Sequence, residues 1–192
     1  MTSTPPRRSP AEQALLDTEL VALVEHKITF NQTLGLKVQT LRPQFNVRFD
    51  MRPELVGHYH YGRLHGGVIS ATLDAMGGCV LMLAIAEKHP AETAEQVMHR
   101  FLKMGTIDLR VDFLRQGMGK HFIASAEVTR LGGRVGSVHS RLHNDQGELI
   151  VSVAIPIQRF RGVLGVLFLF IQRRQQLAAS QVPHLRRPIQ TP

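Results

Sequence analysis

Hydrophobic positions recur at helical spacing near the N-terminus. Ser9 and Glu12 form a capping box around Pro10, which suits the first helical position. Leucine and valine then recur every three or four positions as far as about Lys27. The pattern predicts a helix over residues 10 to about 27, and Gly35 ends the apolar periodicity.

The longest apolar run lies near the middle of the chain, over about 66–87, and it is apolar on every face. Such a helix must be enclosed by protein. The run approaches the length of a membrane span, but it contains Asp74 close to its middle. Strands predicted on both sides of it favour the core helix of a folded domain, so we expect no integral membrane segment.

Alternation of apolar and polar residues predicts strands before and after this helix. Residues 36–41 and 45–51 are expected to pair, and residues 53–63 form a loop. A short helix is expected over 91–103. The strands predicted beyond it cover 107–113, 122 to the Gly132–Gly133 pair, 135–142 and 149–157. One enclosed helix and about six antiparallel strands make an α+β fold in which a curved sheet wraps the helix.

The composition indicates one domain with a tail at each end. The 192 residues are 43% hydrophobic and 20% charged, as in ordinary globular proteins. Residues 1–9 are polar, rich in proline and expected to be disordered, residues 10–158 form the domain, and residues 159–192 form a basic and apolar extension of unknown role.

The net charge of +8 suggests a nucleic acid or an anionic membrane as partner. However, the extension at 159–192 contains six arginines and no acidic residue, so the domain itself is nearly neutral. Aromatic residues are not interleaved with the basic ones, as they are in many nucleic-acid-binding surfaces. We therefore expect no nucleic-acid partner.

Cysteine, histidine and the N-terminal composition limit the other possibilities. Cys79 is the only cysteine, so no intrachain disulfide forms, and we expect a small core residue rather than a nucleophile. His58, His60 and His65 have no acid or cysteine at a spacing typical of zinc sites, so no metal is expected. No apolar signal segment follows the N-terminus, which favours a cytoplasmic protein.

Candidate chemistry lies where the apolar helix begins, at His65, Gly66 and Gly67. Two glycines at this junction allow a ligand to approach the backbone, and the first-turn N–H groups can donate to a carbonyl oxygen or a developing oxyanion. Asp74 lies about two turns further along, where a carboxylate is costly unless it has partners or a task, such as general base catalysis. Alternatively, Asp74 only bonds neighbouring strands and the glycines only permit packing.

The segment His65-Gly66-Gly67, with Asp74 seven residues after the second glycine, resembles the signature of PaaI-type hotdog-fold acyl-CoA thioesterases. The segment from Met104 to Arg115 resembles the strand after the central helix in that family, especially in its YigI-like branch of medium- and long-chain acyl-CoA thioesterases. The resemblance covers about residues 15–158. It implies the hotdog fold, in which a curved antiparallel sheet is wrapped around a long central helix.

The resemblance also implies an activity and an assembly. The enzyme would hydrolyse acyl-CoA to a free acid and coenzyme A, which is part of the substrate, and would need no other cofactor. The active site would lie between two protomers of a homodimer, or of a homotetramer built as a dimer of dimers. A non-catalytic acyl-CoA-binding module with the same fold is the alternative, although a pure binder gains nothing from a buried acid such as Asp74.

Three catalytic positions follow from the resemblance. Asp74 would be the carboxylate that activates water or attacks the thioester carbon. The backbone N–H of Gly66 would polarise the thioester carbonyl, and Thr106 matches a position whose hydroxyl, in some family members, orients the attacking water from the partner subunit. Many family members have an asparagine where this chain has Tyr59.

The expected substrate-binding residues surround the same motif. His65 shapes the loop and Gly67 follows it. The polar contact of the missing asparagine could come from His58, Tyr59 or His60 instead. Arg115 and Arg134 flank turns after the central strands and are candidates for contacts to the phosphates of coenzyme A.

Overall fold

The structure, a computed structural model, describes residues 7–159. Contacts within the chain place these residues in one unit, which ends at Arg159, the last residue of the final strand. The extension predicted at 159–192 lies outside the described residues, apart from Arg159 itself.

The helices come in two groups, before and after the first strands. They are α1 (Pro10–Ala22), the π-helix η1 (Leu23–Lys27), α2 (Thr29–Leu34), the 3-10 helix η2 (Pro53–Leu55), α3 (Gly66–Lys88) and α4 (Ala94–Phe101). The strands are β1 (Lys37–Thr40), β2 (Phe45–Asp50), β3 (Val56–His58), β4 (Arg63–Leu64), β5 (Met104–Thr106), β6 (Arg110–Phe113), β7 (His121–Leu131), β8 (Val135–Asn144) and β9 (Leu149–Arg159).

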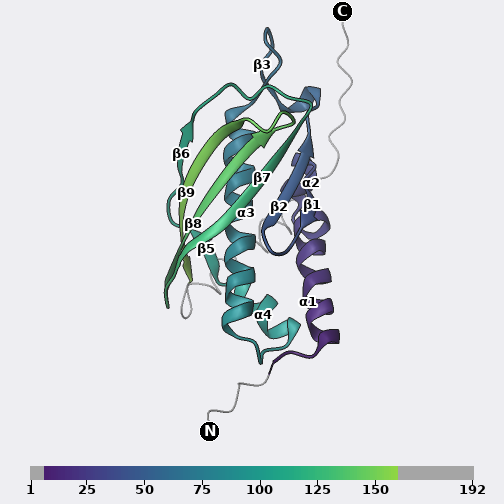
Figure 1. Ribbon diagram of the computed structural model, residues 1–192, viewed down its shortest axis with the longest axis vertical. Coiled ribbons are helices and arrows are strands. Elements are labelled where there is room, and N and C mark those ends of the chain that lie inside the picture. Colours follow the sequence, from purple (N-terminus) through teal and green to yellow (C-terminus); the bar gives the residue numbers. More distant parts are fainter. Residues whose placement is uncertain (1–6, 160–192) are drawn as a thin grey trace, which may run out of the picture. The chain divides into compact units, whose positions relative to one another are not determined.

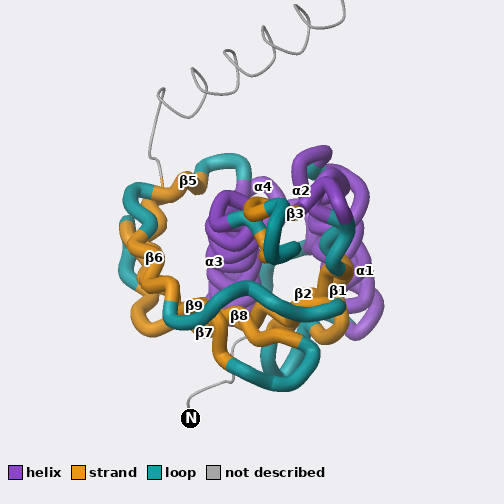
Figure 2. The backbone as a smooth tube through the Cα atoms, turned by 90° about the horizontal axis from the view of Figure 1, so that it is seen from above, coloured by secondary structure: helices purple, strands orange, loops and turns teal. Residues whose placement is uncertain are grey.

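The main sheet is antiparallel and has the order β1-β2-β7-β8-β9-β5, with β6 also paired to β9. It curves around α3, while α1 and α2 lie beside α3 next to β1 and β2 (Figures 1 and 2). Alternate residues of the strands, such as Phe49, Phe122, Leu142 and Val153, are buried in the core. The predicted α+β architecture is therefore confirmed.

The central helix α3 has 23 residues and packs closely on the sheet. A Cβ atom on Gly136 of β8 would lie 2.5 Å from Cδ1 of Leu81, so any larger residue there would displace the Leu81 side chain. By length and composition α3 could cross a membrane, but 56% of its most apolar window is buried inside the described part of the protein. It is the core helix that the sequence predicts.

The final edge of the sheet differs from the single strand expected over 107–113. The chain forms β5 and β6 instead, and both pair with β9. Three residues, 107–109, lie opposite the two residues between Ala154 and Ile157. Pro156 lies at this break, where its carbonyl accepts from the N–H of Ile107, but proline has no N–H with which to continue the ladder.

Two other segments also differ from the sequence-based expectation. The helix predicted over 10–27 ends in a π-helical turn, and α2 follows it before Gly35, whose φ of 75° ends α2. The loop predicted over 53–63 contains η2 and the hairpin of β3 and β4. Three-residue and two-residue strands are too short to produce a recognisable alternation.

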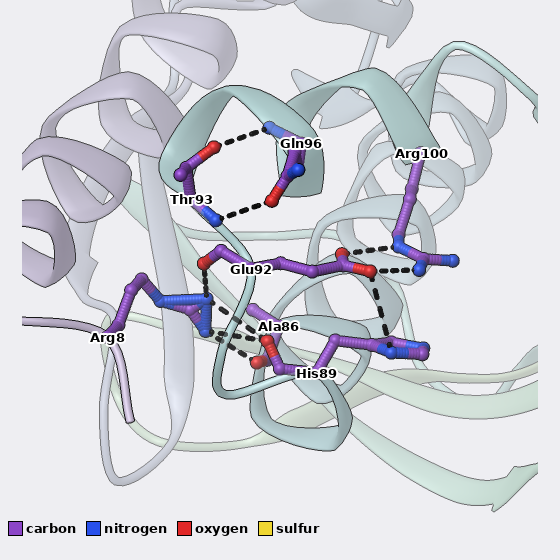
Figure 3. Close-up of polar contacts among 7 residues, drawn as sticks. All are labelled: Arg8, Ala86, His89, Glu92, Thr93, Gln96 and Arg100. Atoms are coloured by element: carbon purple, nitrogen blue, oxygen red, sulfur yellow. Dashed lines mark hydrogen bonds and ion pairs between the residues drawn. The ribbon is translucent and has the colours of Figure 1, made fainter. Parts of the chain in front are cut away.

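The N-terminal segment contacts the fold through Arg8, two residues before α1. The backbone N–H of Arg8 donates to the Pro90 carbonyl at 2.6 Å, and its guanidinium donates to the carbonyls of Ala86 at 2.6 Å and Glu92 at 2.9 Å (Figure 3). These carbonyls lie at and after the end of α3, where backbone acceptors lack helical partners. Arg8, which the sequence places in the N-terminal tail, therefore binds the end of the central helix.

A second set of contacts in Figure 3 holds α4. Thr93 and Gln96 form a capping box, in which each side chain bonds the backbone N–H of the other. Glu92 accepts two hydrogen bonds from the guanidinium of Arg100, one of them from Nε at 2.6 Å. These bonds lower the pKa of the Glu92 carboxyl below its usual value.

Candidate active site

The start of α3 presents one free backbone donor. His65 is the N-cap, and its Nδ1 accepts the N–H of Gly67 at 2.8 Å. The N–H of Gly66 has no acceptor among residues 7–159. A helix N-terminus favours negative charge, so this N–H can stabilise the oxygen of a polarised carbonyl.

A cavity of about 550 Å³ lies at this helix start. Four predicted site residues line it together, namely His58, His65, Gly66 and Arg115. Its remaining lining comes mainly from the β3–β4 hairpin and the segment after β6: Gly57, Arg63, Leu64, Ile69, Phe113, Leu114, Gln116 and Gly117. Phe113 covers Gly66, because a Cβ atom there would lie 3.3 Å from Cζ of the Phe113 ring.

Asp74 and Thr106 form a second group further along α3. The hydroxyl of Thr106, the last residue of β5, donates to Oδ1 of Asp74 at 2.6 Å. In a single chain Asp74 is half-buried rather than enclosed. Its Oδ2 has no hydrogen-bond partner within the described part of the chain, so this oxygen can accept a proton or a hydrogen bond from water.

The helix separates these two groups. Asp74 comes eight residues after Gly66, which is about 12 Å along the axis at the helical rise per residue. Asp74 accordingly does not line the cavity at Gly66. Within one chain, the oxyanion donor and the carboxylate occupy different places.

Arg134 is not brought to this cavity. It is exposed in the turn between β7 and β8. The neighbouring Gly136 packs on Leu81, which lies roughly 22 Å along α3 from Gly66 at the same rise per residue. Within a single chain, Arg115 and Arg134 therefore lie in different places, and only Arg115 lines the cavity.

Arg63 and Phe113 line the cavity although the sequence did not single them out. Arg63 comes two residues before the motif histidine, which was the only available signal. Phe113 belongs to the alternating strand pattern, which does not indicate a site, and 54% of it is exposed in the single chain.

The cavity lining is electropositive, with two arginines, two histidines and no acidic residue.

Cys79 lies elsewhere on α3, and burial raises the pKa of its thiol to about 12, which confirms a core residue rather than a nucleophile. Across residues 7–159, no group of three or more His, Cys, Asp or Glu side chains is placed to hold a metal ion.

Comparisons with known proteins agree with this geometry. The family model of the thioesterase superfamily matches residues 61–151. The medium/long-chain acyl-CoA thioesterase YigI of Escherichia coli K12 is 35% identical over 144 residues, which cover 74% of this chain and 91% of that protein. Its counterpart from Salmonella typhimurium is 36% identical over the same shares.

A solved structure shows the same similarity in three dimensions. It is a protein from Shewanella oneidensis described as related to the thioesterase superfamily. It superposes with a TM-score of 0.74 at 31% identity and covers 80% of this chain and 100% of that one.

Proposed function

Since this chain belongs to the thioesterase superfamily, we propose that it hydrolyses medium- to long-chain fatty acyl-CoA to a free fatty acid and coenzyme A. The observation that supports this best is Asp74, which is oriented by Thr106 on the helix whose first N–H, at Gly66, is free. A carboxylate with one free oxygen can act as a base, and a free N–H can stabilise the developing oxyanion.

The proposed reaction needs water, a base and an electrophilic donor. Oδ2 of Asp74 takes a proton from water while the water oxygen attacks the thioester carbon. The carbonyl oxygen becomes negative and accepts a hydrogen bond from the Gly66 N–H. The carbonyl then re-forms as the carbon–sulfur bond breaks, and the leaving thiolate of coenzyme A takes the proton that Asp74 received from water. We propose no metal or redox cofactor, because none of these steps requires one.

The two groups that act on one thioester come from two copies of the chain in this proposal. A water molecule lies within about 3 Å of both its base and the carbon that it attacks. This reach is well below the separation of about 12 Å between Gly66 and Asp74 along one helix. A dimer in which Asp74 of one copy faces Gly66 of the other satisfies both requirements.

Exposed apolar residues at one sheet edge support such a dimer. Ile107, Phe113 and Leu114 are all about half exposed in the single chain. They lie on or next to β6, which pairs with β9 on one side only. An unpaired strand edge with apolar side chains favours association with a second chain.

We also propose that the protein acts in the cytoplasm. The only cysteine is a buried free thiol, as is common in a reducing compartment.

The direct test is thiol release from a chain-length series of acyl-CoA substrates by the purified protein. Asp74→Asn keeps the shape of the side chain but removes the base, so kcat is expected to fall by about a hundredfold or more. Asp50→Asn, on an exposed acid of β2, is the matched control. Wild-type turnover by Asp74→Asn would refute the role of Asp74. Saturable acyl-CoA binding without thiol release by the wild-type protein would replace the enzyme by the binding module.

A further inference from the structure

The hairpin formed by β3 and β4, residues 56–64, presents a cluster of rings beside the cavity. Its tip projects beyond the start of α3 (Figure 1). The ring centroids of His58 and Tyr61 are 4.9 Å apart, as are those of His60 and Tyr61, and the ring of Tyr59 is stacked on His58 at 5.9 Å. Tyr59 is 94% exposed, so the outer face of its ring is free. We call residues 56–64 the aromatic hairpin.

A cation without an acidic partner lies in the same hairpin. The guanidinium of Arg63 lies 5.2 Å from the centre of the Tyr61 ring, which places its charge near the tip. Arg63 forms no ion pair with any described residue, and the cavity that it lines contains no carboxylate. An unpaired arginine over an aromatic ring is suited to bind a phosphate.

His58 supplies a second indication of a bound molecule. Its Nδ1 is buried and has no hydrogen-bond partner within residues 7–159, although the residue lines the cavity. A buried polar atom without a partner costs free energy, and a bound molecule could recover this cost.

The hairpin is anchored so that its tip lies at a definite distance from the reaction centre. At its base, the N–H groups of Leu64 and His65 donate to the carbonyls of Gly117 and Leu55, both at 2.9 Å. Residues 59–62 form a turn and three residues, 63–65, separate it from Gly66, so Gly62 lies at most about 14 Å from Gly66. This span is comparable to the extended pantetheine arm that joins the thioester of an acyl-CoA to its nucleotide.

We propose that the aromatic hairpin binds the phosphorylated adenosine of coenzyme A, with Arg63 on a phosphate and the Tyr59 ring stacked on the adenine. The proposal rests on the proposed function, since it places the thioester at Gly66. Base stacking on an exposed ring tolerates a mobile ligand end, and the arginine adds attraction for phosphate. The hairpin thereby selects substrates that contain a nucleotide.

The test compares two thioesters with the same acyl chain, acyl-CoA and acyl-pantetheine, which lacks the nucleotide. In the full-length protein, Arg63→Gln is expected to lower the ratio of kcat/KM for acyl-CoA to kcat/KM for acyl-pantetheine about tenfold, as the loss of a charge-assisted bond predicts. Tyr59→Ala is expected to lower this ratio by a similar factor. Arg130→Gln, which changes an exposed arginine of β7, is the matched control.

Equilibrium binding of adenosine 3′,5′-bisphosphate separates this proposal from the proposed function. We expect Arg63→Gln to weaken this binding about tenfold, whether or not thiol is released from either substrate. An unchanged substrate ratio and unchanged bisphosphate affinity in both hairpin variants would overturn the proposal. Binding of the wild-type protein to anionic vesicles but not to the bisphosphate, with the vesicle binding lost in both hairpin variants, would also overturn it and would identify a membrane contact of the hairpin. Failure of the wild-type protein to release thiol from either substrate would refute only the proposed function.

Discussion

The bond between Thr106 and Asp74 joins two residues that lie 32 positions apart in the sequence. Because the Thr106 hydroxyl donates to Oδ1, it fixes the rotation of the carboxylate and leaves Oδ2 free to receive a proton. In the proposed mechanism Thr106 therefore acts through Asp74, and its loss should affect the chemical step more than substrate affinity.

Replacing the hydroxyl by a methyl group tests this role. Thr106→Val is expected to lower kcat about tenfold, since a hydrogen bond to a charged group contributes roughly 1.5–3 kcal/mol, while KM changes little. Thr106→Ser keeps the hydroxyl and should retain most of the activity. Steady-state kinetics of thiol release measure both values. Equal kcat for Thr106→Val and the wild type would show that the bond orients nothing required for turnover.

The sequence placed these residues on the correct elements but could not show their contact. The helical pattern located Asp74 on the long apolar helix, and the family resemblance indicated Thr106. The distance of 2.6 Å between the Thr106 hydroxyl and Oδ1 of Asp74 depends on how β5 pairs with β9 beside α3. This pairing belongs to the tertiary structure and leaves no local pattern in the sequence. The location of Arg134 was equally unavailable, because position after a strand does not specify which end of the central helix that strand approaches.

Among the elements, long segments with a clear period were predicted well and short ones were not. The central helix and the strands β7, β8 and β9 follow their predicted positions because burial on one side imposes a regular pattern. The break between β5 and β6 arises from Pro156 on the neighbouring strand, so the residues of 107–113 contain no sign of it.

The contacts around α4 predict a pH-dependent stability. The guanidinium of Arg100 lowers the pKa of Glu92 in the folded state, so ionised Glu92 stabilises the fold above its unfolded pKa. This contribution disappears as the pH falls through the folded pKa. Glu92→Gln is therefore expected to lower the free energy of unfolding by up to about 1 kcal/mol at pH 7 and to have almost no effect at low acidic pH.

Urea unfolding of the wild type and the variant at both pH values measures this difference. Glu95→Gln, on an exposed acid in the first turn of α4, is the control for a general charge effect. The attribution to Arg100 would be wrong if Glu92→Gln and Glu95→Gln had the same pH profile.

At the scale of the whole molecule, the charge of the chain and its chemistry are located in different parts. Most of the net charge of +8 comes from residues beyond the last strand, which lie outside the described residues. Within the described unit, positive charge matters mainly at the cavity beside Gly66, where no acid balances it. The separation of Gly66 from Asp74 along α3 also concerns the whole molecule, because the proposed mechanism requires a second copy of the chain to bring the two groups together.

Mixing two inactive variants tests the shared site directly. Gly66→Pro removes the N–H, and proline is tolerated at the first helical position when the preceding residue is extended, as His65 is. Asp74→Asn removes the base. Each variant alone should be inactive, whereas Gly66→Ala keeps the N–H and serves as the control for the added Cβ atom.

In a symmetric dimer, each of the two sites takes Gly66 from one copy and Asp74 from the other. A mixed dimer of the two variants then has one damaged site, which contains both substitutions, and one intact site. Random association of equal amounts makes half of the dimers mixed, so co-expressed chains should regain about a quarter of wild-type activity. A site contained within one chain could not be restored in this way, and a mixture as inactive as its components would show that Gly66 and Asp74 do not act across two copies.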